Sequence, residues 1–158
     1  MHQVRLLVNK KLLVLTTSIR LNEETKEPIP AIERYNGVYF RVLRKYLREG
    51  RLRNTDILIV SERYGLIWSD DKIPFYEIQG RMGFLNLDEK AIERLRQENL
   101  QKLEKILDRY SEIYVNVGKE YMRLIKGFEK LASGRIIYAS GSFGAKAAHM
   151  KEWILSRT

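Results

Sequence analysis

Small hydroxyl residues, glycines and a few cations follow the apolar runs of this sequence, where strands are expected to end. Four segments share this composition: Thr16-Thr17-Ser18, Ser61 to Gly65, Gly118 to Tyr121, and Ser140 to Lys146. Such residues leave room for a ligand and expose backbone N–H groups, which suit an anion. We expect the four segments to contribute to one ligand site.

The last of these segments has the features of an anion site. Gly141 and Gly144 allow close approach of the backbone, Ser142 can cap the helix that follows, and Lys146 can reach the same anion. The spacing is not that of the phosphate loop of NTPases, which has four residues between its glycines and a Lys-Ser/Thr pair directly after them. The alternative is a capped helix with a glycine packed on the sheet.

The segment from Ser61 to Gly65 combines a cation with an aromatic ring. Arg63 can hold a phosphate or carboxylate with two hydrogen bonds, and Tyr64 can stack on a base. The alternative is a tyrosine that fills the core beside a solvated arginine.

A strongly basic stretch runs from residue 41 to residue 53. Arg41, Arg44, Lys45 and Arg48 fall on one side of a predicted helix, with Tyr46 nearby, which predicts contacts with a nucleic-acid backbone. The alternative is an ordinary solvated face.

The sequence gives little support for a metal site, a cysteine nucleophile or a catalytic Ser-His-Asp triad. The sequence has no cysteine, which excludes disulfides, thiolate nucleophiles and cysteine zinc sites. Its two histidines, His2 and His149, have no visible ligand partners, and Asp70-Asp71 is more typical of a solvated loop than of a magnesium site. We predict no metal site and no cofactor.

The elements that position these segments alternate along the chain. Strands are predicted near residues 12–16, 56–60, 112–117 and 135–139. Helices are predicted after the caps Asn36 and Asp88, through Tyr121 to Leu131, and from Ser142 to the C-terminal end. In the last helix Phe143, Ala147, Met150 and Ile154 share one apolar face. This order predicts a three-layer α/β/α fold with a mainly parallel four-stranded sheet. The run Val4–Val8 is compatible with an extra N-terminal strand, paired as a hairpin.

Composition sets broad limits. The 158 residues fit a single α/β domain spanning 1–158, and 44% of them are hydrophobic. No apolar run reaches the ~20 residues that span a bilayer, so no membrane association is expected and a cytoplasmic location is predicted. Lys and Arg outnumber Asp and Glu by 29 to 20, a net charge of +9, which favours an anionic partner or reflects a thermophile-like surface.

Several short motifs, taken in order, resemble a family of small domains. In that family a strand ends in a Cys-Ser-Lys-type motif, a helix begins near Tyr-x-Gly-x-x-Phe-Arg, and a second strand ends in Ser-Ala-Lys-Tyr-Gly-Leu. The matching segments here are Pro30-Ala31, Tyr35 to Arg41, Ser61 to Leu66, Ile73 to Tyr76, Gly118 to Tyr121, and Gly141 with Gly144. Thr16-Thr17-Ser18 replaces the first motif, so any role of its thiol is absent.

Such domains look distantly similar to YaaA-type peroxide-stress proteins. They also look similar to an accessory domain of archaeal tRNA-guanine transglycosylase relatives, which is similar in fold to uracil-DNA glycosylases. The resemblance implies nucleic-acid or nucleobase biology without an assigned activity, and it adds Tyr35 and Arg41 to the candidate ligand-binding residues.

Three functions remain open. The first is binding of nucleic acid, a nucleotide or a nucleobase at the carboxyl ends of the parallel strands. The second is an enzyme acting on an N-glycosidic bond, with Glu77 or Asp71 as general base. The third is a non-catalytic interaction subunit, with Ala147-Ala148 facing a partner. The first predicts one pocket, lined by Ser18, Arg63, Tyr64, Tyr121 and Ser142.

Overall fold

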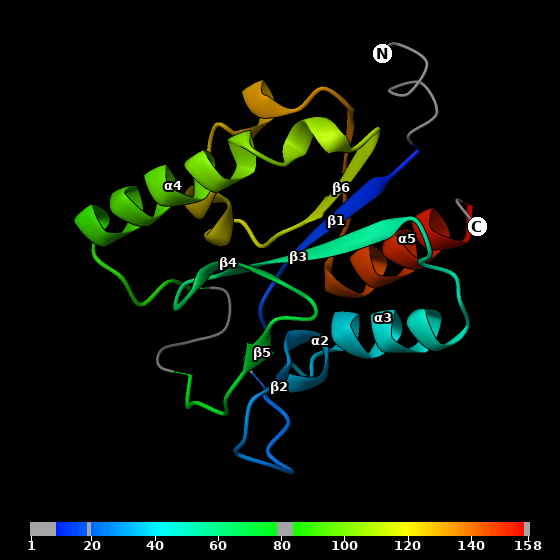
Figure 1. The fold of residues 1–158 in the computed structure, drawn as a ribbon, viewed down its shortest axis with the longest axis horizontal. Helices are drawn as coiled ribbons and strands as arrows, with labels where there is room; N and C mark the ends of the chain where they lie inside the picture. The colour runs from blue at the N-terminus through cyan, green and yellow to red at the C-terminus, as the bar shows by residue number, and fades with distance from the viewer. Residues whose placement is uncertain (1–8, 19, 79–83, 157–158) are drawn as a thin grey trace.

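A five-stranded sheet forms the centre of the protein (Figure 1). The computed structural model describes residues 9–18, 20–78 and 84–156. The strands lie in the order β4 (Gly65–Trp68), β3 (Thr55–Ser61), β1 (Lys11–Thr16), β6 (Glu112–Asn116) and β7 (Arg135–Tyr138). All neighbouring pairs are parallel except β3 and β4. The predicted parallel arrangement of four strands is therefore confirmed.

Helices cover both faces of this sheet. One face carries α2 (Ala31–Arg34), α3 (Val38–Arg48) and α5 (Phe143–Ser156). The other carries α4 (Glu89–Glu104) and the 3-10 helices η1 (Leu107–Arg109), η2 (Tyr121–Leu124) and η3 (Phe128–Leu131). The predicted three-layer α/β/α fold is confirmed.

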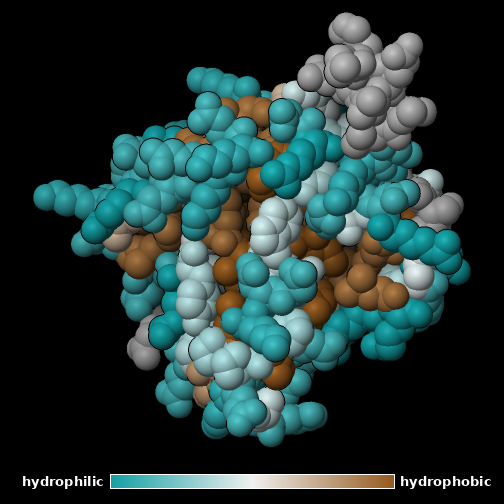
Figure 2. Space-filling model, in the orientation of Figure 1, coloured by the Kyte–Doolittle hydropathy of each residue, from teal (hydrophilic) through white to brown (hydrophobic). Residues whose placement is uncertain are grey.

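The central strand β1 shows why its sequence lacks alternation. Leu13 and Leu15 pack into the core on the α3 and α5 side, while Leu12 and Val14 pack into the core on the α4 side. Since side chains alternate across a strand, a strand buried on both faces reads as a continuous apolar run. Figure 2 shows hydrophobic residues in the band between the helical layers and a mostly hydrophilic surface around it.

Strand β4 was not predicted, because its residues resembled a loop after β3. The Ser61 hydroxyl accepts hydrogen bonds from the amides of Arg63 (3.1 Å) and Tyr64 (2.9 Å), and this turn reverses the chain. Gly65 then adopts a φ of +80° and starts the antiparallel edge strand. Two further short strands, β2 (Ile29–Pro30) and β5 (Lys72–Ile73), pair with each other. The run Val4–Val8 lies outside the described residues.

Two helix predictions need correction. The helix expected through Tyr121 to Leu131 is instead the pair η2 and η3, because Gly127 between them has a left-handed φ of +98°. Helix α3 begins after Gly37, so Asn36 is not its cap. The cap predicted at Asp88 is confirmed, since its side chain accepts a hydrogen bond from the Ala91 amide at 2.8 Å.

A buried arginine fixes the loop between β1 and α2. Arg34 is fully buried, and its guanidinium donates to the backbone carbonyls of Ile73 (3.1 Å), Asn22 (2.6 Å), Thr25 (2.7 Å) and Glu27 (2.5 Å). Carbonyl dipoles thus replace the carboxylate that usually accompanies a buried cation.

Within the described part of the chain, no helix has the length and apolar character needed to cross a membrane.

Candidate ligand cavity

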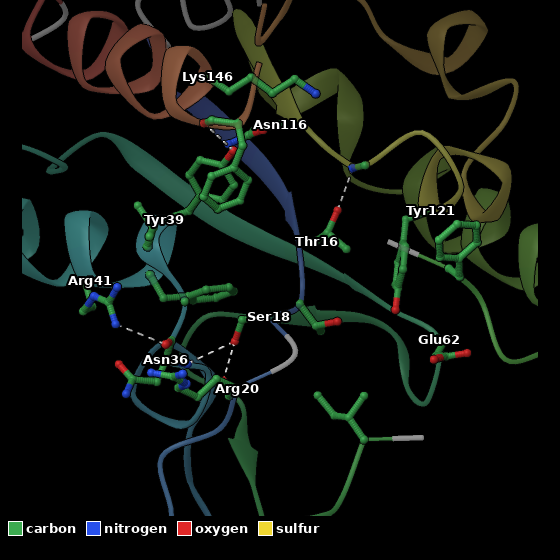
Figure 3. A pocket seen from close by; sticks show the side chains of 18 residues that line it. Thr16, Ser18, Arg20, Asn36, Tyr39, Arg41, Glu62, Asn116, Tyr121 and Lys146 are labelled. Carbon is green, nitrogen blue, oxygen red and sulfur yellow. Dashed lines mark hydrogen bonds between the residues drawn. The ribbon is translucent and has the colours of Figure 1, made fainter. Parts of the chain in front are cut away.

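A cavity of about 610 Å³ lies where the parallel strands end and two helices begin. Strands β1, β3 and β6 lead into it, and the first turns of α3 and α5 border it (Figure 3). Its lining residues are Thr16, Thr17, Ser18, Arg20, Asn36, Gly37, Val38, Tyr39, Phe40, Arg41, Glu62, Ile78, Phe84, Asn116, Gly118, Tyr121, Phe143 and Lys146. This is the edge of an open α/β sheet at which ligands commonly bind.

Backbone and hydroxyl groups hold the strand ends together beneath the cavity. The Thr16 hydroxyl accepts a hydrogen bond from the Gly118 amide at 2.9 Å, which joins the ends of β1 and β6. The Thr17 amide donates to the Val60 carbonyl at 3.3 Å, which joins the ends of β1 and β3. These bonds join the ends of the three strands at the base of the cavity.

Ser18 has a structural role at the cavity wall. Its hydroxyl donates to the Arg20 carbonyl at 2.6 Å and accepts from the Asn36 amide at 3.1 Å. A Cβ atom on Gly37 would lie 2.8 Å from the Ser18 Cβ, so only glycine permits this close approach. Because both hydrogen-bonding functions of the hydroxyl are engaged, Ser18 is poorly suited to act as a nucleophile.

Two aromatic rings from different helices form one wall. The Tyr39 and Phe143 ring centroids are 5.1 Å apart, and the Tyr39 hydroxyl donates to the Phe143 carbonyl at 3.1 Å. Phe143 had been expected on the inward face of its helix with Met150 and Ile154, but its side chain is 57% exposed. The aromatic surface of this wall is thus open to a ligand.

Cations outnumber carboxylates among the described lining residues. The cations are Arg20, Arg41 and Lys146, and the carboxylate is that of Glu62. The Oε2 atom of Glu62 accepts a hydrogen bond from the Asn86 amide at 2.8 Å. The first turn of α3 also lines the cavity, and its cap position, Gly37, has no side chain to occupy the free amides. Both features favour an anionic group.

The phenols at the cavity stay protonated at neutral pH. Burial, helped by the nearby Glu62 carboxylate, raises the pKa of Tyr121 to about 12, although a hydrogen bond with Thr17 acts in the opposite direction. Burial also raises the pKa of Tyr39, against a hydrogen bond with Asn116. Both side chains therefore present neutral hydroxyl groups.

The structure brings about half of the predicted ligand-binding residues to the cavity. Those that line it are Thr16, Thr17, Ser18, Arg41, Gly118, Tyr121 and Lys146. Those that are not among its lining residues are Tyr35, Ser61, Arg63, Tyr64, Gly65, Gly141, Ser142 and Gly144. Of the five residues predicted to share one pocket, Ser18 and Tyr121 do so.

Arg63 covers a cluster of tyrosines instead of lining the cavity. Its guanidinium carbon lies 4.8 Å from the centre of the Tyr76 ring and 5.7 Å from that of Tyr64. The Tyr76 hydroxyl is 2.7 Å from that of the fully buried Tyr35. Burial, followed by the contact with Tyr76, raises the pKa of Tyr35. The arrangement is close to the alternative given for this segment, a tyrosine packed into the core, with Arg63 added above the rings in a cation–π contact.

The glycines before α5 act as turn residues. Gly141 has a φ of +98°, and a Cβ atom there would lie 2.5 Å from the Cβ of Ala145. A Cβ atom on Gly144 would have no neighbour within 4 Å. Gly141, Ser142 and Gly144 are all exposed. The anion loop expected here is therefore a tight entry to the helix, and Lys146 in its first turns is what reaches the cavity.

The basic residues of α3 differ in how far their side chains are already engaged within the protein. Arg44 donates to the carbonyls of Ile32 (2.8 Å) and Tyr35 (2.9 Å) and to the Asn36 Oδ1 (2.9 Å). These bonds use the guanidinium to close the turn between α2 and α3, and the contact of Arg44 with a nucleic-acid backbone stays a prediction. Lys45 and Arg48 are exposed, and their contact with nucleic acid stays a prediction.

The carboxylates proposed as general bases lie elsewhere. Neither Asp71 nor Glu77 is among the lining residues, and Asp71 accepts a hydrogen bond from the Trp68 amide at 2.7 Å in the turn after β4. The carboxylate at the cavity is Glu62, one residue after β3 ends. Its position directly after a buried strand was the available signal.

Sequence reasoning also missed the residues contributed by the helix starts. Asn36, Tyr39 and Phe143 fall in or beside predicted helices, where a side chain's direction depends on how the helix is docked. Across the described ranges, no group of three or more His, Asp or Glu side chains is placed to hold a metal ion. His149 instead pairs through Nδ1 with the Tyr114 hydroxyl at 2.6 Å.

Comparisons with known proteins give no family. No family model matches the chain, and no curated protein matches it. A solved structure described as AF0587, a protein of unknown function, is similar over 95% of this chain and 46% of its own, with 13% sequence identity and a TM-score of 0.48. The chain thus spans about half the length of that protein.

Proposed function

We propose that the protein binds a nucleotide, free or as part of a nucleic acid, in the cavity at the ends of β1, β3 and β6. The observation that carries the proposal is the combination of open aromatic rings with three cations in one cavity at the strand ends. Aromatic faces stack on bases, and cations with free helix amides hold phosphate. The net charge of +9 also favours an anionic ligand.

The cavity also has the size that small ligands require. Ligand pockets commonly measure ~300–1,000 Å³ and combine apolar walls with a few polar groups. The walls here are Tyr39, Phe84 and Phe143, and the cations are Arg20, Arg41 and Lys146, a set of side chains suited to a molecule with one flat ring and one charged group.

Isothermal titration of nucleoside monophosphates tests this proposal. Lys146→Ala should weaken nucleotide binding by roughly 10- to 150-fold, because a charge-assisted hydrogen bond to phosphate contributes about 1.5–3 kcal/mol. Lys151→Ala is the matched control, since Lys151 is an exposed lysine of the same helix and is not among the lining residues. Equal binding by the two variants, or no binding by the wild type, would contradict the proposal.

A second candidate is hydrolysis of an N-glycosidic bond, favoured by one observation. Glu62 places a carboxylate at the cavity, beside the neutral phenol of Tyr121. In this reaction the Glu62 carboxylate takes a proton from water, and the water oxygen bonds to the sugar carbon as the bond to the base breaks. The electron pair of that bond stays on the base nitrogen, which takes up a proton equivalent to the one that Glu62 removed, so that the carboxylate is restored. Chromatographic detection of free base, abolished by Glu62→Gln, would support this candidate over simple binding.

A further inference from the structure

Glu62 lies at one end of the cavity, apart from the cations Arg20, Arg41 and Lys146. Figure 3 places Lys146 above Tyr39, Arg41 below it and Arg20 near Ser18, while Glu62 lies across the cavity below Tyr121. The sheet explains this separation. Glu62 follows β3 and Lys146 follows β7, and these strands stand three positions apart in the sheet. Strands in a sheet are ~4.8 Å apart, so the strand ends differ by about 14 Å.

The carboxylate end is built to accept hydrogen bonds. The Asn86 amide holds one oxygen of Glu62 at 2.8 Å, which fixes the orientation of the carboxylate and leaves further lone pairs for a ligand. Phe84, two residues before Asn86, also lines the cavity with a side chain that is 54% exposed. A flat ring can stack on Phe84 while its edge donates to Glu62.

The cationic end is built to hold an anion. Arg41 is an exposed residue of α3, and Lys146 is a half-buried residue of α5. The two cations lie on opposite sides of Tyr39 in Figure 3, and the Lys146 ammonium can hold a phosphate oxygen of a ligand whose other end reaches Glu62.

We propose that the cavity selects a guanine nucleotide, with its base against Phe84 and Glu62 and its phosphate at Lys146. The inference rests on the proposed nucleotide binding and deepens it. A carboxylate only accepts hydrogen bonds, and guanine presents two adjacent N–H donors on its pairing edge. Adenine and cytosine place a ring acceptor beside their amino group, and uracil places a carbonyl on each side of its N–H, so each of them sets a lone pair against the carboxylate.

Glu62→Gln is the decisive variant. The glutamine side chain keeps the shape of glutamate, and its amide oxygen can still accept from Asn86, so the 84–86 segment stays in place. It loses the second acceptor that guanine needs. Glu77→Gln is the matched control, because Glu77 is an exposed carboxylate outside the lining residues.

Titration calorimetry with GMP, IMP, AMP and inorganic phosphate separates the possibilities. IMP lacks only the exocyclic amino group. Wild-type protein and Glu77→Gln should bind GMP roughly tenfold more tightly than IMP or AMP, as expected for a bidentate contact to a base. Glu62→Gln should bring GMP to within about threefold of AMP. Lys146→Ala should weaken the binding of GMP and AMP by the same factor and leave the ratio of their affinities unchanged.

Each of the remaining outcomes contradicts either the selection of guanine or the binding of nucleotides as a whole. Equal affinity of the wild type for GMP and AMP, or a ratio that Glu62→Gln leaves unchanged, overturns the guanine selection while nucleotide binding stands. Phosphate binding as tight as GMP binding means that the base is not contacted and overturns the selection too. Absence of any nucleotide binding overturns this inference together with the proposed function.

Discussion

Replacing Arg34 with methionine should destabilise the protein by about 2–4 kcal/mol, because a buried network loses its central donor. The guanidinium is fully buried and donates to four backbone carbonyls. Its bond to Ile73 is buried, so that carbonyl would be left without a partner, whereas the carbonyls of Asn22, Thr25 and Glu27 are partly exposed and can regain water. Methionine also avoids the cost of burying a charge, which keeps the estimate below the sum of four charged hydrogen bonds.

Urea denaturation followed by tryptophan fluorescence measures this effect. Trp153 is a suitable reporter because it lies in the core and stacks on Tyr114 at 4.8 Å between ring centroids. Arg34→Lys is the informative companion variant, since it keeps the charge but not the planar fork that reaches separated carbonyls. It should be destabilised as well. A methionine variant within about 0.5 kcal/mol of the wild type, the usual range of surface substitutions, would refute the reasoning.

Three further outcomes follow from the same structure. Gly65→Ala should lower the midpoint of urea unfolding, because Gly65 has a φ of +80° and a Cβ atom would lie 2.7 Å from the Asn99 Oδ1; an unchanged midpoint would show that this turn relaxes freely. Gly141→Ala should destabilise the entry to α5, whereas Gly144→Ala should be neutral or stabilising by up to about 1 kcal/mol, and thermal melts that reverse this order would contradict the turn geometry. Stability should fall as pH rises above about 10, because burial raises the pKa of Tyr35 in the folded protein, so the unfolded chain loses this proton first; denaturation at pH 9 and pH 11 with equal midpoints would oppose this assignment.

The sequence predicted the sheet well because its signals are local. The continuous apolar runs of β1 and β3 reflect burial on both faces, and the long connections between strands dictate parallel pairing. The strand ends at Thr16 and Gly118 could be located for the same reason. Lys146 could be placed because the first turn of a helix after a parallel strand lies at that edge.

The features that the sequence did not reveal depend on contacts between segments far apart in the chain. No local pattern shows that Arg44 is bound by the α2–α3 turn, or that Arg63 lies on Tyr76, because both depend on how loops fold over the sheet. Periodicity alone placed Phe143 on one helix face with Met150 and Ile154, although its helix starts at the cavity. Glu62 was overlooked beside Arg63, since the turn at Ser61 decides which of the two neighbours faces the ligand space.

A two-dimensional NMR titration of labelled protein with GMP tests the central claim most directly. If the cavity is the nucleotide site, the largest shifts of backbone amides should fall on residues 16–18, on Gly118 and on the first turns of α3 and α5. The far end of α3, with Lys45 and Arg48, should move little, because these residues do not line the cavity. Shifts confined to that basic surface, or no shifts at millimolar nucleotide, would contradict the assignment of the cavity as a nucleotide site.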